Sequence, residues 1–302
     1  MVRIGVDLGG TKIEAAALDE TGGFLVRRRT PTPGDYEAKL LAVRDLVAGI
    51  EREIGVADAP VGVGHPGSLS PRPGLIRNAN TTQLNGRALD RDLAGALRRP
   101  VACANDANCF ALSEAVDGAG AGARSVFGVI VGTGVGGGLV IDGALHRGHD
   151  GNAGEWGHTA LPWPSLDEVP GPACKCGLNG CIEAWCSGPG LAADHARATG
   201  ERLDAHAIAA NAQAGDTAAQ ASLDRHAARL ARGLAVVINI VDPERIVLGG
   251  GLSNLPGLAE SLQSRLAAWT FTDQLAVQVT GNVHGDSSGV RGAAWLNPLR
   301  PL

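Results

Sequence analysis

The chain has 302 residues, of which 44% are hydrophobic and 19% charged, so it can bury a core and is not intrinsically disordered. It carries 26 Lys and Arg against 31 Asp and Glu, a balance that argues against nucleic acid as a partner. No apolar stretch is long enough to span a bilayer and no signal segment precedes the first predicted strand, so we expect a cytoplasmic protein with no membrane partner.

The first 118 residues show the mixture of strands and helices that is typical of an α/β domain. Hydrophobic residues alternate from Val2 to Leu8, which predicts a strand, and Leu40, Val43 and Val47 have the spacing of one helix face. Strands are expected at residues 2–8, at 13–18, from 24 onward, at 61–63 and at 101–104, and helices at 36–54 and 107–117.

A similar order of elements begins again at Ser125. Strands are expected at residues 126–131, 138–141 and 245–248, and helices at about 216–240 and 287–296. We therefore predict an α/β protein of two similar domains with a ligand cleft between them. The predicted domains are a small N-terminal one, residues 1–118, with a C-terminal helix of about 287–302 packing back on it, and a larger one, residues 119–286.

Three glycine-rich loops follow predicted strands. Glycine lets the backbone approach a phosphate closely, and free N–H groups and a Thr hydroxyl can donate to its oxygens. The residues expected to bind a nucleotide are Asp7, Gly9, Gly10, Thr11, Lys12, Gly132, Thr133, Gly134, Gly249, Gly250 and Gly251. Asp7 could also hold Mg²⁺, directly or through water. Each loop alone is more often only a turn, but three of them in two similar halves favour a bound nucleotide.

Asn105 and Asp106 lie where a predicted strand ends and a helix begins. In the functional interpretation, Asp106 accepts the proton of a hydroxyl group that is phosphorylated, and Asn105 fixes a neighbouring hydroxyl. The alternative is purely structural, because Asn and Asp are preferred N-caps. A carboxylate at a helix N-terminus is a weak base, but phosphoryl transfer needs chiefly alignment and charge neutralisation.

A cysteine cluster in the second half predicts a metal site. Cys174, Cys176 and Cys181 lie in a glycine-rich loop, and His158 is the candidate for a fourth ligand of a structural zinc ion. The alternative is three free cysteines. Glu155 and Glu183 lie next to these ligands in sequence, and carboxylates suit the recognition of sugar hydroxyls.

Taken together, these motifs resemble those of the ROK family of sugar kinases and sugar-responsive repressors. The matching segments are residues 7–12, 105–108, 132–138, 154–158, 174–183 and 246–251. The resemblance implies an actin-like ATPase (ribonuclease H-like) fold, Mg²⁺-dependent transfer from ATP to a hexose, and a homodimer. It implies Asp106 as the catalytic base, and as sugar-binding residues Gly67, Asn80, Asn105, Asp106, Glu155, His158 and Glu183.

Residues 78–86 and 284–296 are most similar to bacterial fructokinases of the manno(fructo)kinase type, so fructose is the expected acceptor. One departure from the family is His65, where an aliphatic residue is usual; we expect it to face the core as a satisfied histidine. The alternative acceptors are N-acetylglucosamine, N-acetylmannosamine, glucose and mannose. A sugar-sensing regulator is the alternative of another class, but the first strand begins at Val2 and leaves no room for a preceding helix-turn-helix.

Overall fold

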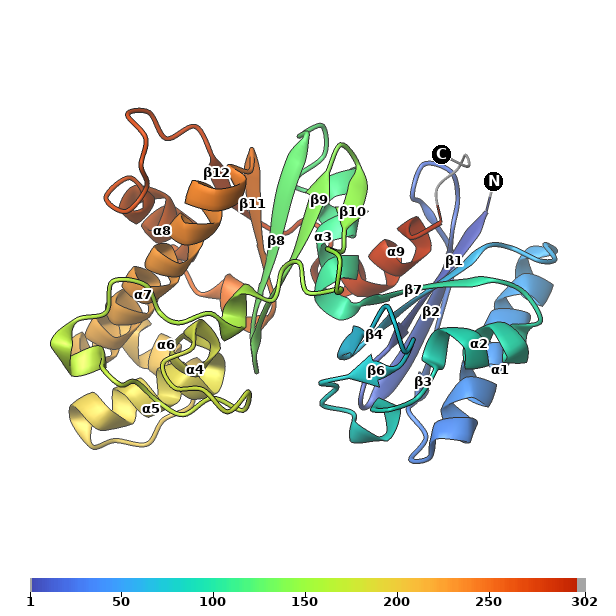
Figure 1. Ribbon diagram of the computed structural model, residues 1–302, viewed down its shortest axis with the longest axis horizontal. Helices are drawn as coiled ribbons and strands as arrows, with labels where there is room; N and C mark the ends of the chain where they lie inside the picture. Colours follow the sequence, from blue (N-terminus) through green and yellow to red (C-terminus); the bar gives the residue numbers. More distant parts are fainter. Residues whose placement is uncertain (1, 298–302) are drawn as a thin grey trace. The chain divides into compact units, whose positions relative to one another are not determined.

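The computed structural model describes residues 2–297 of the chain (Figure 1). Within this range the chain divides into two compact units. The first unit comprises residues 2–122, 138–153 and 283–297, and the second comprises residues 123–137 and 154–282. Among these residues, no helix is both long enough and apolar enough to cross a membrane.

The first unit is built on a five-stranded sheet in the order β3-β2-β1-β4-β7. Its strands are β1 (Arg3–Leu8), β2 (Lys12–Leu18), β3 (Phe24–Pro31), β4 (Val61–His65) and β7 (Val101–Asn105). Strands β1, β2 and β3 form an antiparallel meander, whereas β4 and β7 continue the sheet parallel to β1. The segment after β4 forms a small antiparallel pair, β5 (Ser68–Leu69) and β6 (Ile76–Arg77), and a 3-10 helix, η1 (Thr82–Leu84).

Helices cover both faces of this sheet (Figure 1). They are α1 (Tyr36–Ile54), α2 (Leu89–Leu97), α3 (Asp106–Asp117) and α9 (Ser288–Trp295), the last preceded by the 3-10 helix η5 (Gly285–Ser287). Helices α1 and α2 share a buried aliphatic core with the strands. Helix α9 packs on β1 and β4, where a Cβ on Gly5 would lie 2.0 Å from the Val290 carbonyl oxygen and one on Gly62 would lie 1.8 Å from that of Ala293. The two glycines therefore allow the helix backbone to contact the strands directly.

A second five-stranded sheet has the order β10-β9-β8-β11-β12. Its strands are β8 (Ser125–Val131), β9 (Val135–Ile141), β10 (Ala144–His146), β11 (Arg245–Gly249) and β12 (Gln278–Gly281). In both sheets the first strand in chain order is central, the second and third lie on one side of it, and the fourth and fifth lie parallel to it on the other. The repeated order confirms the prediction of two similar α/β halves.

The second unit is dominated by the 25-residue helix α7, whose central residues Leu230, Ala231, Leu234 and Ala235 are fully buried. Its helices are α4 (Ile182–Cys186), α5 (Gly188–Thr199), α6 (Ala205–Gln213), α7 (Thr217–Val241) and α8 (Leu258–Leu266), and its 3-10 helices are η2 (Trp156–His158), η3 (Leu166–Glu168) and η4 (Gly251–Asn254). Helix α7 packs against α4, α5, α6 and α8.

The units differ from the predicted domains in three segments, residues 119–122, 138–153 and 283–286, all of which belong to the first unit although the predicted second domain included them. Residues 138–153 do so because the chain leaves the second unit within β9. Helix α9 belongs to the first unit, while residues 298–302 of the predicted final helix lie outside the described residues. The sequence interpretation missed helices α2, α4, α5, α6 and α8.

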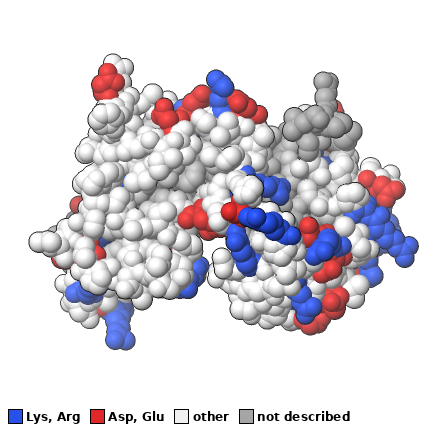
Figure 2. Space-filling view, viewed as in Figure 1, with Lys and Arg blue, Asp and Glu red and all other residues white. Residues whose placement is uncertain are grey.

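Charged side chains of both signs are interspersed on the face shown in Figure 2. Lys and Arg side chains lie beside Asp and Glu side chains on this face (Figure 2). Ion pairs of the first unit include Arg28–Glu53 and Arg72–Asp150.

Candidate active site

The first glycine-rich loop, residues 9–11, is the turn between β1 and β2. A Cβ on Gly9 would lie 2.7 Å from the Lys12 carbonyl oxygen, so this turn requires glycine there. Asp7 lies near the end of β1, and burial, with the neighbouring carboxylates of Asp106 and Glu14, raises its pKa to about 6. Neighbouring negative carboxylates repel each other, and a cation bound between them would relieve this repulsion.

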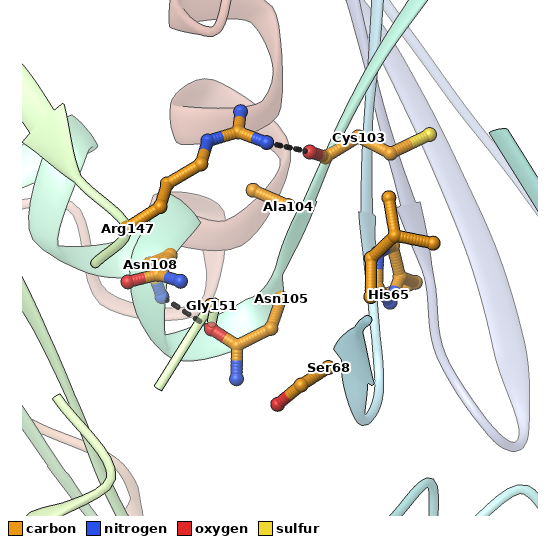
Figure 3. A pocket seen from close by; sticks show the side chains of 9 residues that line it. His65, Ser68, Cys103, Ala104, Asn105, Asn108, Arg147 and Gly151 are labelled. Carbon is orange, nitrogen blue, oxygen red and sulfur yellow. Dashed lines mark hydrogen bonds between the residues drawn. The ribbon is translucent and has the colours of Figure 1, made fainter. Parts of the chain in front are cut away.

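Asn105 and Asp106 lie at the junction of β7 and α3, as the sequence predicts. Asn105 is the N-cap of α3, since its side-chain oxygen accepts a hydrogen bond of 2.8 Å from the Asn108 N–H (Figure 3). Asp106 is the first residue of the helix, and its Oδ1 accepts from the Ala107 N–H at 2.8 Å. The helix cap is therefore Asn105 and not Asp106. The first turn of the helix orients the Asp106 carboxylate, and Asp106 is exposed.

Two further residues predicted to bind sugar lie in loops of the same unit. Gly67 has a φ of +78°, and a Cβ there would lie 2.8 Å from Ala79, which precedes Asn80. The loops that carry Gly67 and Asn80 are thus neighbours, and Asn80 is exposed. The first unit therefore holds Asp7, the first loop, Gly67, Asn80, Asn105 and Asp106.

The second and third glycine-rich loops lie together in the second unit. Residues 132–134 form the turn between β8 and β9, and residues 249–251 follow at the end of β11. Gly250 has a φ of +81°, and a Cβ there would lie 2.5 Å from the Val131 carbonyl oxygen at the end of β8. After the third loop the chain forms the short 3-10 helix η4, and α8 begins only at Leu258.

Glu183, in the first turn of α4, contacts the second loop. Its Oε2 accepts from the Val135 N–H at 3.0 Å, and its Oε1 lies 3.1 Å from Lys175 Nζ. A Cβ on Gly134 would lie 2.7 Å from the same Oε2. The carboxylate therefore ties the cysteine loop, which carries Lys175, to the glycine-rich turn, a connection that the sequence interpretation did not foresee.

The four predicted zinc ligands come together in the second unit. The candidate ligand atoms of His158, Cys174, Cys176 and Cys181 all lie within 4.8 Å of one another. The His158 Nδ1 is 3.5 Å from the Cys174 sulfur, and the sulfurs of Cys176 and Cys181 are 3.6 Å apart. Ligands on a tetrahedral zinc ion with Zn–S bonds of about 2.3 Å are separated by roughly 3.8 Å, so this donor set fits zinc.

Glu155 directly precedes η2, which carries His158, and is exposed. This segment is held against β9, because Trp156 Nε1 donates to the Gly136 carbonyl at 2.9 Å and a Cβ on Gly157 would lie 2.1 Å from the Val135 carbonyl oxygen. The second unit therefore brings together two loops, the cysteine cluster, Glu155 and Glu183.

His65 lies at the end of β4 and is fully buried. Its Nδ1 is 3.2 Å from the Pro66 carbonyl oxygen, but its Nε2 has no hydrogen-bond partner among the described residues. The expectation of a buried histidine is confirmed, and the expectation that it is satisfied is wrong for one ring nitrogen.

Comparison with known proteins assigns the chain to a family. The ROK family model matches residues 3–299. N-acetyl-D-glucosamine kinase of Salmonella paratyphi B is 40% identical over 298 residues, covering 97% of this chain and 98% of that protein. The enzyme of the same description from Photobacterium profundum is 41% identical over 301 residues, with coverages of 97% and 98%.

Among solved structures, a ROK hexokinase from Thermus thermophilus has a TM-score of 0.89 and 36% identity, covering 99% of this chain and 98% of that chain. A ROK family glucokinase from Streptomyces griseus, in complex with glucose and AMPPNP, has a TM-score of 0.78 and 31% identity, with coverages of 97% and 98%.

Two α/β units with one strand order and glycine-rich turns after their first strands define an actin-like ATPase fold, as predicted. The chain belongs to the ROK family and is a sugar kinase, a phosphotransferase with an alcohol group as acceptor.

Proposed function

We propose that the protein transfers the γ-phosphate of ATP to a hydroxyl group of a hexose, and that N-acetyl-D-glucosamine is the first candidate for this acceptor. The observation that carries the choice of acceptor is the similarity along 97% of the chain to N-acetyl-D-glucosamine kinases. The sequence prediction of fructose is not confirmed, because neither of these relatives is named a fructokinase.

Fructose is the second candidate. The resemblance of residues 78–86 and 284–296 to fructokinases favours it, and the first of these segments carries Asn80, a predicted sugar-binding residue. Hydroxyl-binding side chains serve all hexoses alike, so the shape of such loops decides between acceptors.

Asp106 is the proposed catalytic base, taking the proton from the acceptor hydroxyl as it attacks the phosphorus. Its exposure and its bond to the Ala107 N–H support this role, because the carboxylate is oriented without being closed off by protein. Phosphoryl transfer passes through a loose transition state, for which positioning matters more than basicity. The proposed acceptor ligands are Gly67, Asn80, Asn105, Glu155, His158 and Glu183.

We propose that the three glycine-rich loops hold the nucleotide phosphates. Asp7 would hold Mg²⁺, and its raised pKa beside Asp106 supports a cation at this position. The ion would neutralise charge on the phosphate oxygens when bound. Lys12, at the start of β2, adds a positive charge next to the first loop.

The cluster of Cys174, Cys176, Cys181 and His158 is proposed to hold a structural zinc ion, since four protein ligands leave no open position for hydrolytic chemistry. The ion would fix His158 and, through Lys175 and Glu183, the second glycine-rich loop. Family resemblance also supports a cytoplasmic homodimer.

The experiment that tests the proposal is a coupled ADP-release assay of the purified protein with MgATP. The acceptor panel contains N-acetylglucosamine, N-acetylmannosamine, fructose, glucose and mannose. We expect turnover with at least one sugar and the highest kcat/KM with N-acetylglucosamine. A highest value with fructose would replace the first acceptor candidate by the second. ADP release that no sugar stimulates would contradict the kinase proposal, and retardation of DNA at physiological salt would then favour a regulator.

A further inference from the structure

A small pocket in the first unit adjoins the proposed acceptor ligand Asn105. It has a volume of about 40 Å³ and is lined by side chains that include His65, Ser68, Cys103, Asn108 and Arg147 (Figure 3). A cavity of this volume admits one hydroxyl group or one to three water molecules, but not a whole sugar. For a sugar, the pocket can therefore serve only as an extension of a larger binding site.

His65 lines this pocket and carries a buried hydrogen-bond acceptor. A carbonyl oxygen can only accept, so the contact between His65 Nδ1 and the Pro66 carbonyl places the ring proton on Nδ1. Burial lowers the pKa of His65 to about 4, which keeps the ring neutral at pH 7. The other ring nitrogen, Nε2, is then an unprotonated acceptor that is buried and has no partner among the described residues.

A second acceptor without a partner lines the same pocket. Asn108 Oδ1 is buried and, among residues 2–297, no group donates to it. Two buried acceptors that lack a partner among the described residues are unfavourable unless a donor is supplied. These two acceptor atoms would therefore favour a bound group that carries an O–H or N–H donor.

The remaining lining side chains fix the pocket beside the proposed sugar ligand. His65 and Asn105 are directly opposite in the parallel pairing of β4 and β7. The oxygen of the Asn105 amide bonds to the Asn108 N–H, and its nitrogen is directed away from that bond (Figure 3). Arg147 is held in place by a hydrogen bond of 2.8 Å to the Cys103 carbonyl. Strands β4 and β7 and helix α3 therefore hold the pocket in a fixed shape.

We propose that this pocket is a subsite for one hydroxyl group of the acceptor sugar, and that His65 accepts a hydrogen bond from that hydroxyl. The inference rests on the proposed hexose kinase function and adds a specificity-determining residue to it. An aliphatic side chain at this position would fill the wall without offering an acceptor. This protein would therefore discriminate among hydroxyl positions more strongly than a relative with an aliphatic residue.

The test measures sugar dissociation constants by calorimetry, and KM values, for the wild type, His65→Leu and His65→Gln. His146→Leu is the matched control, because His146 is an exposed histidine of the same unit that does not line the pocket. Each protein is tested with the best acceptor of the panel and with its monodeoxy analogues. Melting temperatures verify that the variants fold.

We expect His65→Leu to weaken sugar binding about tenfold, with the KM for ATP changed less than twofold, and His65→Gln to retain part of the affinity because its amide oxygen still accepts. One deoxy analogue should bind the wild type about tenfold more weakly than the parent sugar and bind His65→Leu no more weakly than the parent does. Equal losses for every analogue in both proteins would overturn the inference and leave the pocket to water. A failure of all sugars to bind the wild type would overturn the kinase proposal as well.

Discussion

Glu114 offers a test of how the first unit is held together. This carboxylate in α3 is completely buried and accepts four hydrogen bonds. Its Oε2 accepts from the N–H groups of Ala119 at 3.0 Å and Val283 at 3.1 Å. Its Oε1 accepts from the His284 N–H at 3.3 Å and the Ser288 hydroxyl at 2.9 Å. Val283 is where the chain returns to the first unit, so Glu114 fastens α3 to the returning segment.

Replacing Glu114 with alanine removes all four acceptor interactions and leaves buried donors unpaired. Leaving a buried hydrogen-bond donor unsatisfied costs about 1–3 kcal/mol, so we expect a total loss of about 3–5 kcal/mol for this group of donors. That loss is a large part of a total free energy of unfolding of about 5–15 kcal/mol. For a unit of this size it corresponds to a decrease in Tm of roughly 10 °C. Glu114→Gln keeps the shape of the side chain but puts an N–H₂ group opposite donors, so we expect a loss of about 2–3 kcal/mol.

The assay is urea and thermal unfolding followed by circular dichroism. Glu37→Ala is the matched control, because Glu37 is exposed in α1 of the same unit, and its effect should stay within about 0.5 kcal/mol. If Glu114→Ala and Glu114→Gln both unfold within about 1 kcal/mol of the wild type, the reasoning about this carboxylate is refuted.

Three further predictions concern the second unit. We expect one zinc ion per chain by elemental analysis, with Tm falling when a chelator removes it; a metal-free protein with unchanged Tm would contradict the zinc proposal. Gly250→Ala should raise the KM for ATP at least tenfold because of the close Val131 carbonyl, whereas Gly257→Ala, also at positive φ but with open space around it, should have little effect. Burial alone would raise the pKa of Glu168, but hydrogen bonds from Arg232 and Arg229 outweigh it and lower the pKa to about 2. Because this folded-state pKa lies below the ordinary value of 4.5, the stabilisation is complete above pH 4.5 and is lost as the pH falls toward 2. The difference in urea midpoint between the wild type and Glu168→Gln should therefore shrink from pH 7 to pH 3, and a constant difference would contradict this assignment.

The parts of the molecule that the sequence predicts are those whose signal is local. A pattern of about ten residues is enough to predict each of three features. Alternation predicts the strand and turn of Asp7, capping residues predict the junction at Asn105, and cysteine spacing predicts the loop of Cys174. The two sheets follow because the same local pattern occurs twice.

Features that depend on distant partners were not predictable in this way. Glu114 is one acidic residue in a predicted helix, and its partners Val283 and Ser288 come 169 and 174 residues later. Burial of the chain around His65 leaves one ring nitrogen without a hydrogen-bond partner among residues 2–297, which no periodicity of the sequence reveals. Helices α5 and α6 are rich in alanine, so their apolar faces are weakly marked.

Asp106 is central to the proposed function, as the base of a sugar kinase. The direct measurement is the rate of ADP release by Asp106→Asn with the best acceptor, together with the affinity of the variant for that sugar. We predict that kcat falls by at least about 100-fold while sugar binding is retained, because a general base typically contributes 10²–10⁴-fold. Asp273→Asn, an exposed acid in the second unit, should behave as the wild type. Turnover of Asp106→Asn within about tenfold of the wild type would contradict the central claim.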